Sequence, residues 1–244
     1  TSAGATLGHA KANKIGSVGK PLVGTELRIA DPDEDGNGEI QFKGRHVMAG
    51  YYKNPEATAE TMTEDGWLKS GDLGKIDSDG FVYVTGRLKE IYVSSAGKNI
   101  APLVIEETMK SIPIVSQCML VGDNRKYCSA LFTLDVGAIL RDVHGLDGAT
   151  EVPKDPAEQL AKLADLGHDL SEYTAVGSDT YNQLNQAVME LNKKFSNPEQ
   201  IKKFTVLPRD LSVDHGELTP TLKIRRKQIR ENWASEIEEM YAGA

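Results

Sequence analysis

Closely spaced turn residues divide the first third of the chain into short β-branched runs, and this pattern most restricts the folds open to it. Runs with strand composition occur at 27–29, 39–42 and 81–84. Between them, the clusters 31–38 (DPDEDGNG) and 77–80 (DSDG) carry glycines that can supply the positive φ angles of hairpin turns. We therefore predict a β-rich region over residues 1–86.

After Arg87 the pattern changes to strands mixed with longer helices. The runs 115–121 and 129–134 are apolar, and the polar turn between them predicts an antiparallel pair. A second domain is expected to begin here and to extend over 87–244, with a helical insertion at about 141–195. The fold class is thus α+β: a β-rich subdomain, the tail of a larger N-terminal domain, followed by a small mixed domain.

Helices are predicted from a starting Pro, from apolar residues spaced by three and four, or from both signals together. The predicted helices span 55–61, 102–112, 156–166, 181–195 and a last segment from about 225. Asn54 is the expected N-cap of the first helix. In the last one, a single continuous helix would align Ile229, Trp233, Ile237 and Tyr241 on one face.

Composition excludes several classes of function. The formal net charge of −8 does not suit a general nucleic-acid binder, because affinity for phosphate backbones depends on an excess of Lys and Arg. No apolar run approaches the roughly 20 residues that span a bilayer. The five histidines never share a face with cysteine or carboxylate at ligand spacing, so we expect no structural metal. Cys118 and Cys128 are interpreted as reduced cytosolic thiols.

Several ordered motifs point to one enzyme family. They lie at 66–72 (GWLKSGD), 86–90 (GRLKE), 97–102 (GKNIAP) and 217–223 (ELTPTLK), after upstream runs at 16–21 (GSVGKP), 38–44 (GEIQFKG) and 47–55 (VMAGYYKNP). Together they resemble the adenylate-forming superfamily of acyl-CoA synthetases, luciferases and peptide-synthetase adenylation domains. The resemblance covers nearly the whole chain.

The resemblance implies that Asp72 and Arg87 bind the nucleotide. Asp72 follows a Ser-Gly turn, where an ionised carboxylate can accept hydrogen bonds from both ribose hydroxyls. Arg87 offers a rigid fork of donors suited to ribose oxygens or the α-phosphate. The alternatives are a turn-forming aspartate and a surface salt bridge to Asp or Glu.

Lys223 is the expected catalytic residue. Attack of a carboxylate on the α-phosphate concentrates negative charge that a positioned ammonium stabilises in the transition state. Here Leu222 stands where the family more often has a glycine before its lysine, which makes the registration less secure. The alternative is that Lys223 merely joins Arg225, Arg226, Lys227 and Arg230 in a solvated basic helix start, and we expect that description to hold for these last four.

Two further roles follow from the resemblance alone. Lys89 occupies the family's hinge position, where a few backbone dihedrals absorb the rotation of the mobile C-terminal lid. Gly97, with Asn99 nearby, is expected to line the path of the pantetheine arm of CoA, because glycine permits close approach. A tight turn explains Gly97 almost as well.

The resemblance implies an ATP-dependent long-chain fatty acid-CoA ligase that uses ATP, Mg²⁺ and CoA. The family's Ser/Thr/Gly-rich phosphate loop does not occur in these residues, so we expect a fragment that is inactive alone. A fatty acyl-AMP ligase that loads a carrier protein and a non-catalytic nucleotide- or partner-binding module remain alternatives. The expected partners are fatty acid, ATP and CoA, without nucleic acid. The expected location is cytoplasmic, with peripheral membrane contact and a homodimer left open.

Overall fold

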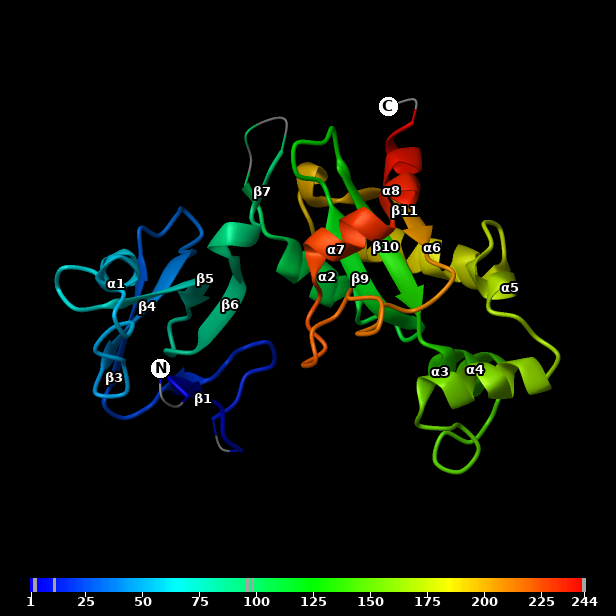
Figure 1. Cartoon of the computed structure of the whole chain (residues 1–244), viewed down its shortest axis with the longest axis horizontal. Helices are drawn as coiled ribbons and strands as arrows, with labels where there is room; N and C mark the ends of the chain where they lie inside the picture. Colours follow the sequence, from blue (N-terminus) through cyan, green and yellow to red (C-terminus); the bar gives the residue numbers. More distant parts are fainter. Residues whose placement is uncertain (2–3, 11, 95–96, 98, 243–244) are drawn as a thin grey trace. The chain divides into compact units, whose positions relative to one another are not determined.

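The computed structural model describes residues 1, 4–10, 12–94, 97 and 99–242, and the chain forms two compact units. One unit spans Thr1–Ile91 and the other Tyr92–Ala244 (Figure 1). The division falls a few residues after the boundary of 86 and 87 that the sequence predicts. Lys98, which belongs to the motif at 97–102, lies outside the described residues.

An antiparallel four-stranded sheet forms the centre of the first unit. Its strands follow one another in chain order: β3 (Thr25–Ala30), β4 (Gly38–Gly44), β5 (Leu68–Ile76) and β6 (Val82–Arg87). The three predicted strand runs fall within this sheet or at its edge, and the turn clusters 31–38 and 77–80 connect neighbouring strands as expected. Gly36 and Gly80 supply the positive φ angles, at 78° and 82°.

Short elements complete the first unit. They are β1 (Thr6–Leu7), β2 (Lys20–Pro21), α1 (Pro55–Thr61) and the 3₁₀ turn Leu88–Glu90. The predicted helix α1 is confirmed in both its ends and its cap, since the Asn54 side chain accepts a hydrogen bond from the Ala57 amide at 3.0 Å. Lys14 joins the N-terminal segment to the β5–β6 turn through Asp77 and Asp79, at 2.6 and 2.7 Å.

A three-stranded sheet forms the centre of the second unit. Its strands are β9 (Val115–Val121), β10 (Cys128–Leu134) and β11 (Ile201–Val206), with β10 in the middle. The predicted β9–β10 antiparallel pair is confirmed, and β11 joins β10 in parallel. A separate hairpin pairs β7 (Tyr92–Val93) with β8 (Asn99–Ile100). The expected α+β class describes the chain.

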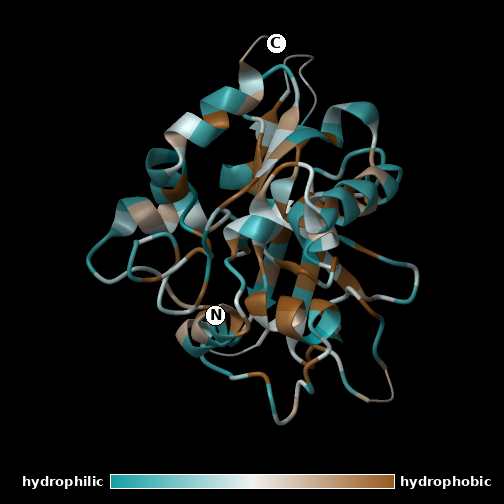
Figure 2. Cartoon of the chain, turned by 90° about the vertical axis from the view of Figure 1, so that its right-hand side faces the viewer, coloured by the Kyte–Doolittle hydropathy of each residue, from teal (hydrophilic) through white to brown (hydrophobic). Residues whose placement is uncertain are grey.

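The three-stranded sheet is covered on both faces. Cys118, Leu120, Ala130 and Phe132 face one hydrophobic cluster, which includes residues of α2 (Pro102–Met109) and α6 (Asp179–Asn192). The alternate residues Met119, Val121 and Leu131 face a second cluster with α7 (Arg226–Asn232) and α8 (Ala234–Tyr241). Figure 2 shows many hydrophobic residues along the strands and both hydrophilic and hydrophobic residues along the helices.

Much of the segment predicted as a helical insertion packs into the first cluster. It contains the end of the π-helical turn Ile139–Val143, which follows the short α3 (Val136–Ala138), and then α4 (Pro156–Asp165), α5 (Ser171–Thr174) and α6. Leu163, Tyr173, Leu184 and Val188 are buried in the cluster. Helix α6 is therefore part of the core of the second unit, as its apolar stripe predicts.

The predicted continuous C-terminal helix is wrong, because the structure breaks it at Trp233 into α7 and α8. Trp233 has φ −117° and ψ 30°, outside the helical range. Its indole Nε1 donates a hydrogen bond to Glu217 at 2.9 Å. The expected apolar face is otherwise present, with Ile229 and Ile237 buried, but Met240 is buried more deeply than Tyr241.

Candidate nucleotide and lysine sites

Asp72 and Arg87 lie opposite each other on β5 and β6. Arg87 Nε donates to Asp72 Oδ1 at 3.1 Å, and the two side chains are 54% and 37% exposed. The other carboxylate oxygen of Asp72 accepts no hydrogen bond from the described residues. The structure thus brings together the two predicted nucleotide ligands, and the salt bridge foreseen as an alternative for Arg87 is formed with Asp72 itself.

The Ser-Gly pair before Asp72 lies inside β5 rather than in a turn, at an irregularity in the pairing with β4. Gly71 has φ 73°, a conformation that glycine adopts without strain. Its amide donates to Glu39 Oε1 at 3.1 Å, and the Asp72 amide donates to Ser70 Oγ at 3.0 Å. Ser70 Oγ in turn donates to the Ile40 carbonyl at 2.6 Å. Each residue of the Ser-Gly-Asp run therefore takes part in fixing the backbone that carries the carboxylate on β5.

Lys223 is exposed on a hairpin loop between Glu217 and α7. An isolated antiparallel bridge joins Leu218 to Ile224, and the Thr219 amide donates to the Lys223 carbonyl at 2.8 Å. We call residues 218–224 the lysine loop. The Lys223 ammonium has no hydrogen-bond or ion-pair partner among the residues the structure describes, so it is available to a phosphate.

The backbone at Leu222 has the conformation that a glycine would adopt at this position. Its φ of 59° lies in the left-handed region, which costs an L-residue other than glycine about 1 to 2 kcal/mol. A glycine would adopt this φ freely. The turn therefore keeps a backbone that suits glycine although the side chain has changed, which supports the alignment of Lys223 with the family's lysine.

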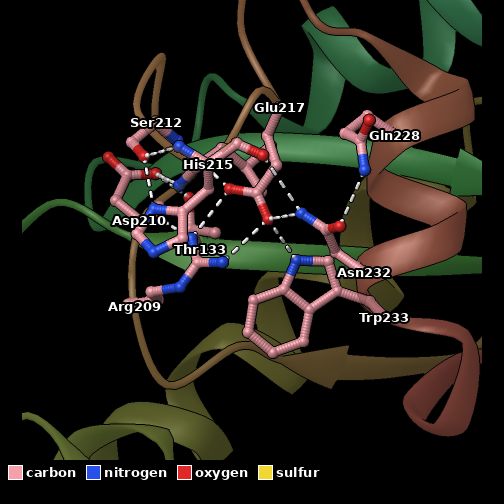
Figure 3. Close-up of polar contacts among 10 residues, drawn as sticks. Thr133, Arg209, Asp210, Ser212, His215, Glu217, Gln228, Asn232 and Trp233 are labelled. Atoms are coloured by element: carbon pink, nitrogen blue, oxygen red, sulfur yellow. Dashed lines mark hydrogen bonds and ion pairs between the residues drawn. The ribbon is translucent and has the colours of Figure 1, made fainter.

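Glu217 anchors the start of the lysine loop (Figure 3). Its carboxylate is fully buried and accepts hydrogen bonds from Arg209, Asn232, Trp233 and the Ser212 amide, at 2.7 to 3.2 Å. Burial raises the pKa of Glu217, but hydrogen bonds from Arg209, Asn232 and the Ser212 amide outweigh it and lower the pKa to about 2. The side chain is thus a carboxylate at neutral pH.

Arg226 anchors the segment that follows the lysine loop. It donates to both oxygens of Glu106 on α2, at 2.6 and 2.7 Å, and the side chains of this pair are 16% and 4% exposed. Arg230 donates to the Tyr92 hydroxyl at 3.1 Å and is partly buried. The predicted solvated basic cluster is therefore wrong for Arg226 and Arg230, because the Glu106 carboxylate faces the first and the Tyr92 hydroxyl faces the second.

Sequence reasoning assigned no role to Glu217 or Glu106. Glu217 stands at the start of the quoted 217–223 run, and that position is the only signal in the sequence. Glu106 lies on the apolar helix α2 and is separated from Arg226 by 120 residues. The burial of these two carboxylates and the identity of their partners become visible only in the tertiary structure.

The remaining predicted residues lie on exposed turns. Lys89 is in the 3₁₀ turn Leu88–Glu90, near the end of the first unit. Gly97, between β7 and β8, is exposed with φ 77°, and its amide donates to the Ser94 carbonyl at 2.8 Å. A tight turn thus accounts for the glycine, and a contact with pantetheine stays a prediction.

The second unit matches a known family. Residues 89–143 and 168–244 match the model of the AMP-binding enzyme C-terminal domain, and residues 144–167 lie outside the match. The fold and the lysine loop define an adenylate-forming enzyme domain. The chain belongs to the AMP-binding, or adenylate-forming, enzymes and carries their C-terminal domain.

Curated relatives match the chain almost from end to end. A long-chain-fatty-acid–CoA ligase, FadD15 of Mycobacterium tuberculosis, is 41% identical over 99% of this chain, which spans 36% of that protein. The long-chain-fatty-acid–CoA ligase ACSBG2 of Gallus gallus is 40% identical over 98% of the chain, which spans 31% of that protein. The chain therefore spans about a third of the length of these relatives.

Solved structures share the fold. The adenylation domain of a carboxylate reductase from Mycobacterium chelonae is 21% identical with a TM-score of 0.64, over 93% of this chain and 32% of that one. The o-succinylbenzoate coenzyme A synthetase of Bacillus subtilis, in complex with ATP and magnesium ion, is 26% identical with a TM-score of 0.57, over 89% and 36%. These matches support the α+β description.

The described residues contain neither a metal-binding cluster nor a membrane-spanning helix. No cluster of three or more His, Cys, Asp and Glu side chains in the described part could hold a metal ion. Within the same part, no helix has the length and apolar character needed to cross a membrane.

Proposed function

We propose that this chain is the C-terminal part of a long-chain fatty acid-CoA ligase. The observation that supports it most is the pair of relatives with that activity in their names, 41% and 40% identical over nearly the whole chain. The Asp72–Arg87 pair and the available Lys223 provide the matching chemistry: a carboxylate and guanidinium for a ribose, and an ammonium for a phosphate. ATP, with its Mg²⁺, fatty acid and CoA are the substrates under this proposal.

The reaction has two steps. A fatty carboxylate oxygen attacks the α-phosphorus of ATP, and the bond to pyrophosphate breaks, which leaves acyl-AMP. The CoA thiolate then attacks the acyl carbonyl, a thioester forms, and AMP leaves with the electron pair. Lys223 stabilises the charge of the first transition state. Under the proposal, rotation about Lys89 withdraws Lys223 after this step and brings the Gly97 turn to the pantetheine.

The decisive experiment is Lys223→Ala in the full-length protein. Removing one transition-state donor costs about 100- to 1000-fold in rate, so acyl-AMP formation should fall by that factor. Thioester formation from supplied acyl-AMP and CoA should persist, since Lys223 does not act in that step. The matched control is Lys227→Ala, because Lys227 is 92% exposed and its ammonium lies 3.9 Å from Glu231. Equal loss of both steps would refute the assignment of Lys223.

A second experiment addresses the acceptor and the fragment. Acyl-CoA should form with free CoA, and product only on a carrier protein would instead favour an acyl-AMP ligase. The 244-residue chain alone should show no sustained thioester formation from ATP, magnesium, fatty acid and CoA. Turnover by the chain alone would contradict the expectation that it needs an adenylate-binding region.

A further inference from the structure

The lysine loop is held at both ends by buried carboxylates from different parts of the second unit. Glu217 lies directly before the loop and bonds Arg209. Arg226, two residues after the loop, bonds Glu106. We propose that Glu217 and Glu106 are positioning residues for acyl-adenylate formation, which keep the loop rigid so that Lys223 reaches the α-phosphate in one fixed place. This inference rests on the proposed function of Lys223.

At the start of the loop, the Glu217 carboxylate connects three segments. It accepts hydrogen bonds from both terminal nitrogens of Arg209, in the segment after β11, at 2.7 and 2.8 Å. It also receives Asn232 Nδ2 at 3.0 Å and Trp233 Nε1 at 2.9 Å, at the junction of α7 and α8. Because the carboxylate is fully buried, each lost partner would leave a buried polar group unsatisfied.

At the other end, Glu106 connects α7 to the sheet. Its Oε1 accepts the Leu120 amide of β9 at 2.7 Å, and Arg226 donates to both of its oxygens. A planar guanidinium that bonds both oxygens has a fixed direction as well as a fixed distance. The first residue of α7 is therefore tied to α2 and β9.

Backbone bonds carry this constraint towards the tip. The Arg225 amide donates to the Glu217 carbonyl at 2.7 Å, and the Thr219 amide donates to the Lys223 carbonyl at 2.8 Å. The side chain of Leu218 is buried against the second hydrophobic cluster. These contacts attach the base of the loop to the second unit.

Position matters because the ammonium acts on a transition state. A misplacement of about 1 Å can cost about 100-fold in rate. Loosening either end should therefore lower the rate of adenylation and leave ground-state binding of ATP almost unchanged. A residue that only stabilises the fold would instead lower both half-reactions together.

The test uses two variants of the full-length enzyme, one for each end of the loop. Glu217→Gln keeps the shape and removes the charge, and Arg226→Lys keeps the charge and removes the two-point contact. We expect the kcat of acyl-AMP formation to fall at least about tenfold in each, with the KM for ATP within about twofold. The rate of thioester formation from supplied acyl-AMP should stay near that of the parent. Lys227→Ala is the control, and Lys223→Ala gives the size of the full effect.

A second measurement is independent of activity. Amide hydrogen exchange should increase more for the peptide 217–224 than for the β9 and β10 peptides in both variants, because the core strands report only the change in overall stability. Slower adenylation with slower thioester formation, or an increase in exchange at 217–224 no greater than in β9 and β10, overturns the positioning role. Normal adenylation in both variants also overturns it, provided Lys223→Ala is impaired. If Lys223→Ala retains normal adenylation, the proposed function falls together with this inference.

Discussion

The ionised Glu217 makes the stability of the second unit depend on acid pH. Its pKa falls from the ordinary 4.5 to about 2 on folding, and one pKa unit corresponds to about 1.4 kcal/mol. That drop in pKa corresponds to a contribution of at most about 3 kcal/mol to the unfolding free energy. Arg209 is 32% exposed, so we expect about 2 to 3 kcal/mol after solvent screening.

The sign follows from proton linkage. Because the folded-state pKa is the lower one, the contribution is fully present above about pH 4.5 and is lost as the pH falls towards about 2. Glu217→Gln removes the titrating group. We therefore expect this variant to be less stable than the parent near neutral pH, and the difference in unfolding free energy to shrink by about 2 to 3 kcal/mol as the pH falls.

Trp233 offers a local signal, since its indole contacts the Glu217 carboxylate. In a Trp67→Phe background, the fluorescence of Trp233 during urea unfolding reports on the second unit alone. The unfolding free energy should be measured at about pH 6 and about pH 3 for the parent and for Glu217→Gln, and roughly 1 to 2 kcal/mol of the difference should be lost between these two pH values. Glu239→Gln, an exposed glutamate of α8, is the control. Parallel pH profiles for the parent and Glu217→Gln would refute the reasoning.

Two further predictions concern the Leu222 turn and the nucleotide pair. Leu222→Gly should raise the unfolding free energy by between about 0 and 1 kcal/mol, because relief of the left-handed backbone slightly exceeds the entropic cost of an added glycine. Little packing is lost, since the leucine is 67% exposed. A decrease of more than about 1 kcal/mol in urea unfolding would contradict this. Asp72→Asn and Arg87→Gln should each weaken AMP binding by the full-length protein in calorimetry, and the double variant should lose less than the sum, since the two side chains are in contact. The unfolding free energy obtained from thermal unfolding should change by less than about 1 kcal/mol in either single variant, because the pair is exposed.

Local patterns predicted the elements whose signals lie within a few residues. Asn54 and Pro55 specify both the start and the cap of α1, and the turn cluster 77–80 specifies the β5–β6 hairpin. The order of the motifs also indicated the family and the candidates Asp72, Arg87 and Lys223. These signals are readable because caps, turns and motif spacings depend on neighbours in the chain.

Only the tertiary structure decided which charged residues are buried and what they contact. The sequence by itself determined that the C-terminal segment is helical and basic, but not that Arg226 meets Glu106 or that Trp233 breaks the helix to reach Glu217. A buried charge is stable only when partners from other segments surround it, and those partners are brought together by the packing of helices on the sheet. Long-range contacts of this kind leave no periodic signal along the chain, and in this protein they hold the segments on either side of the lysine loop.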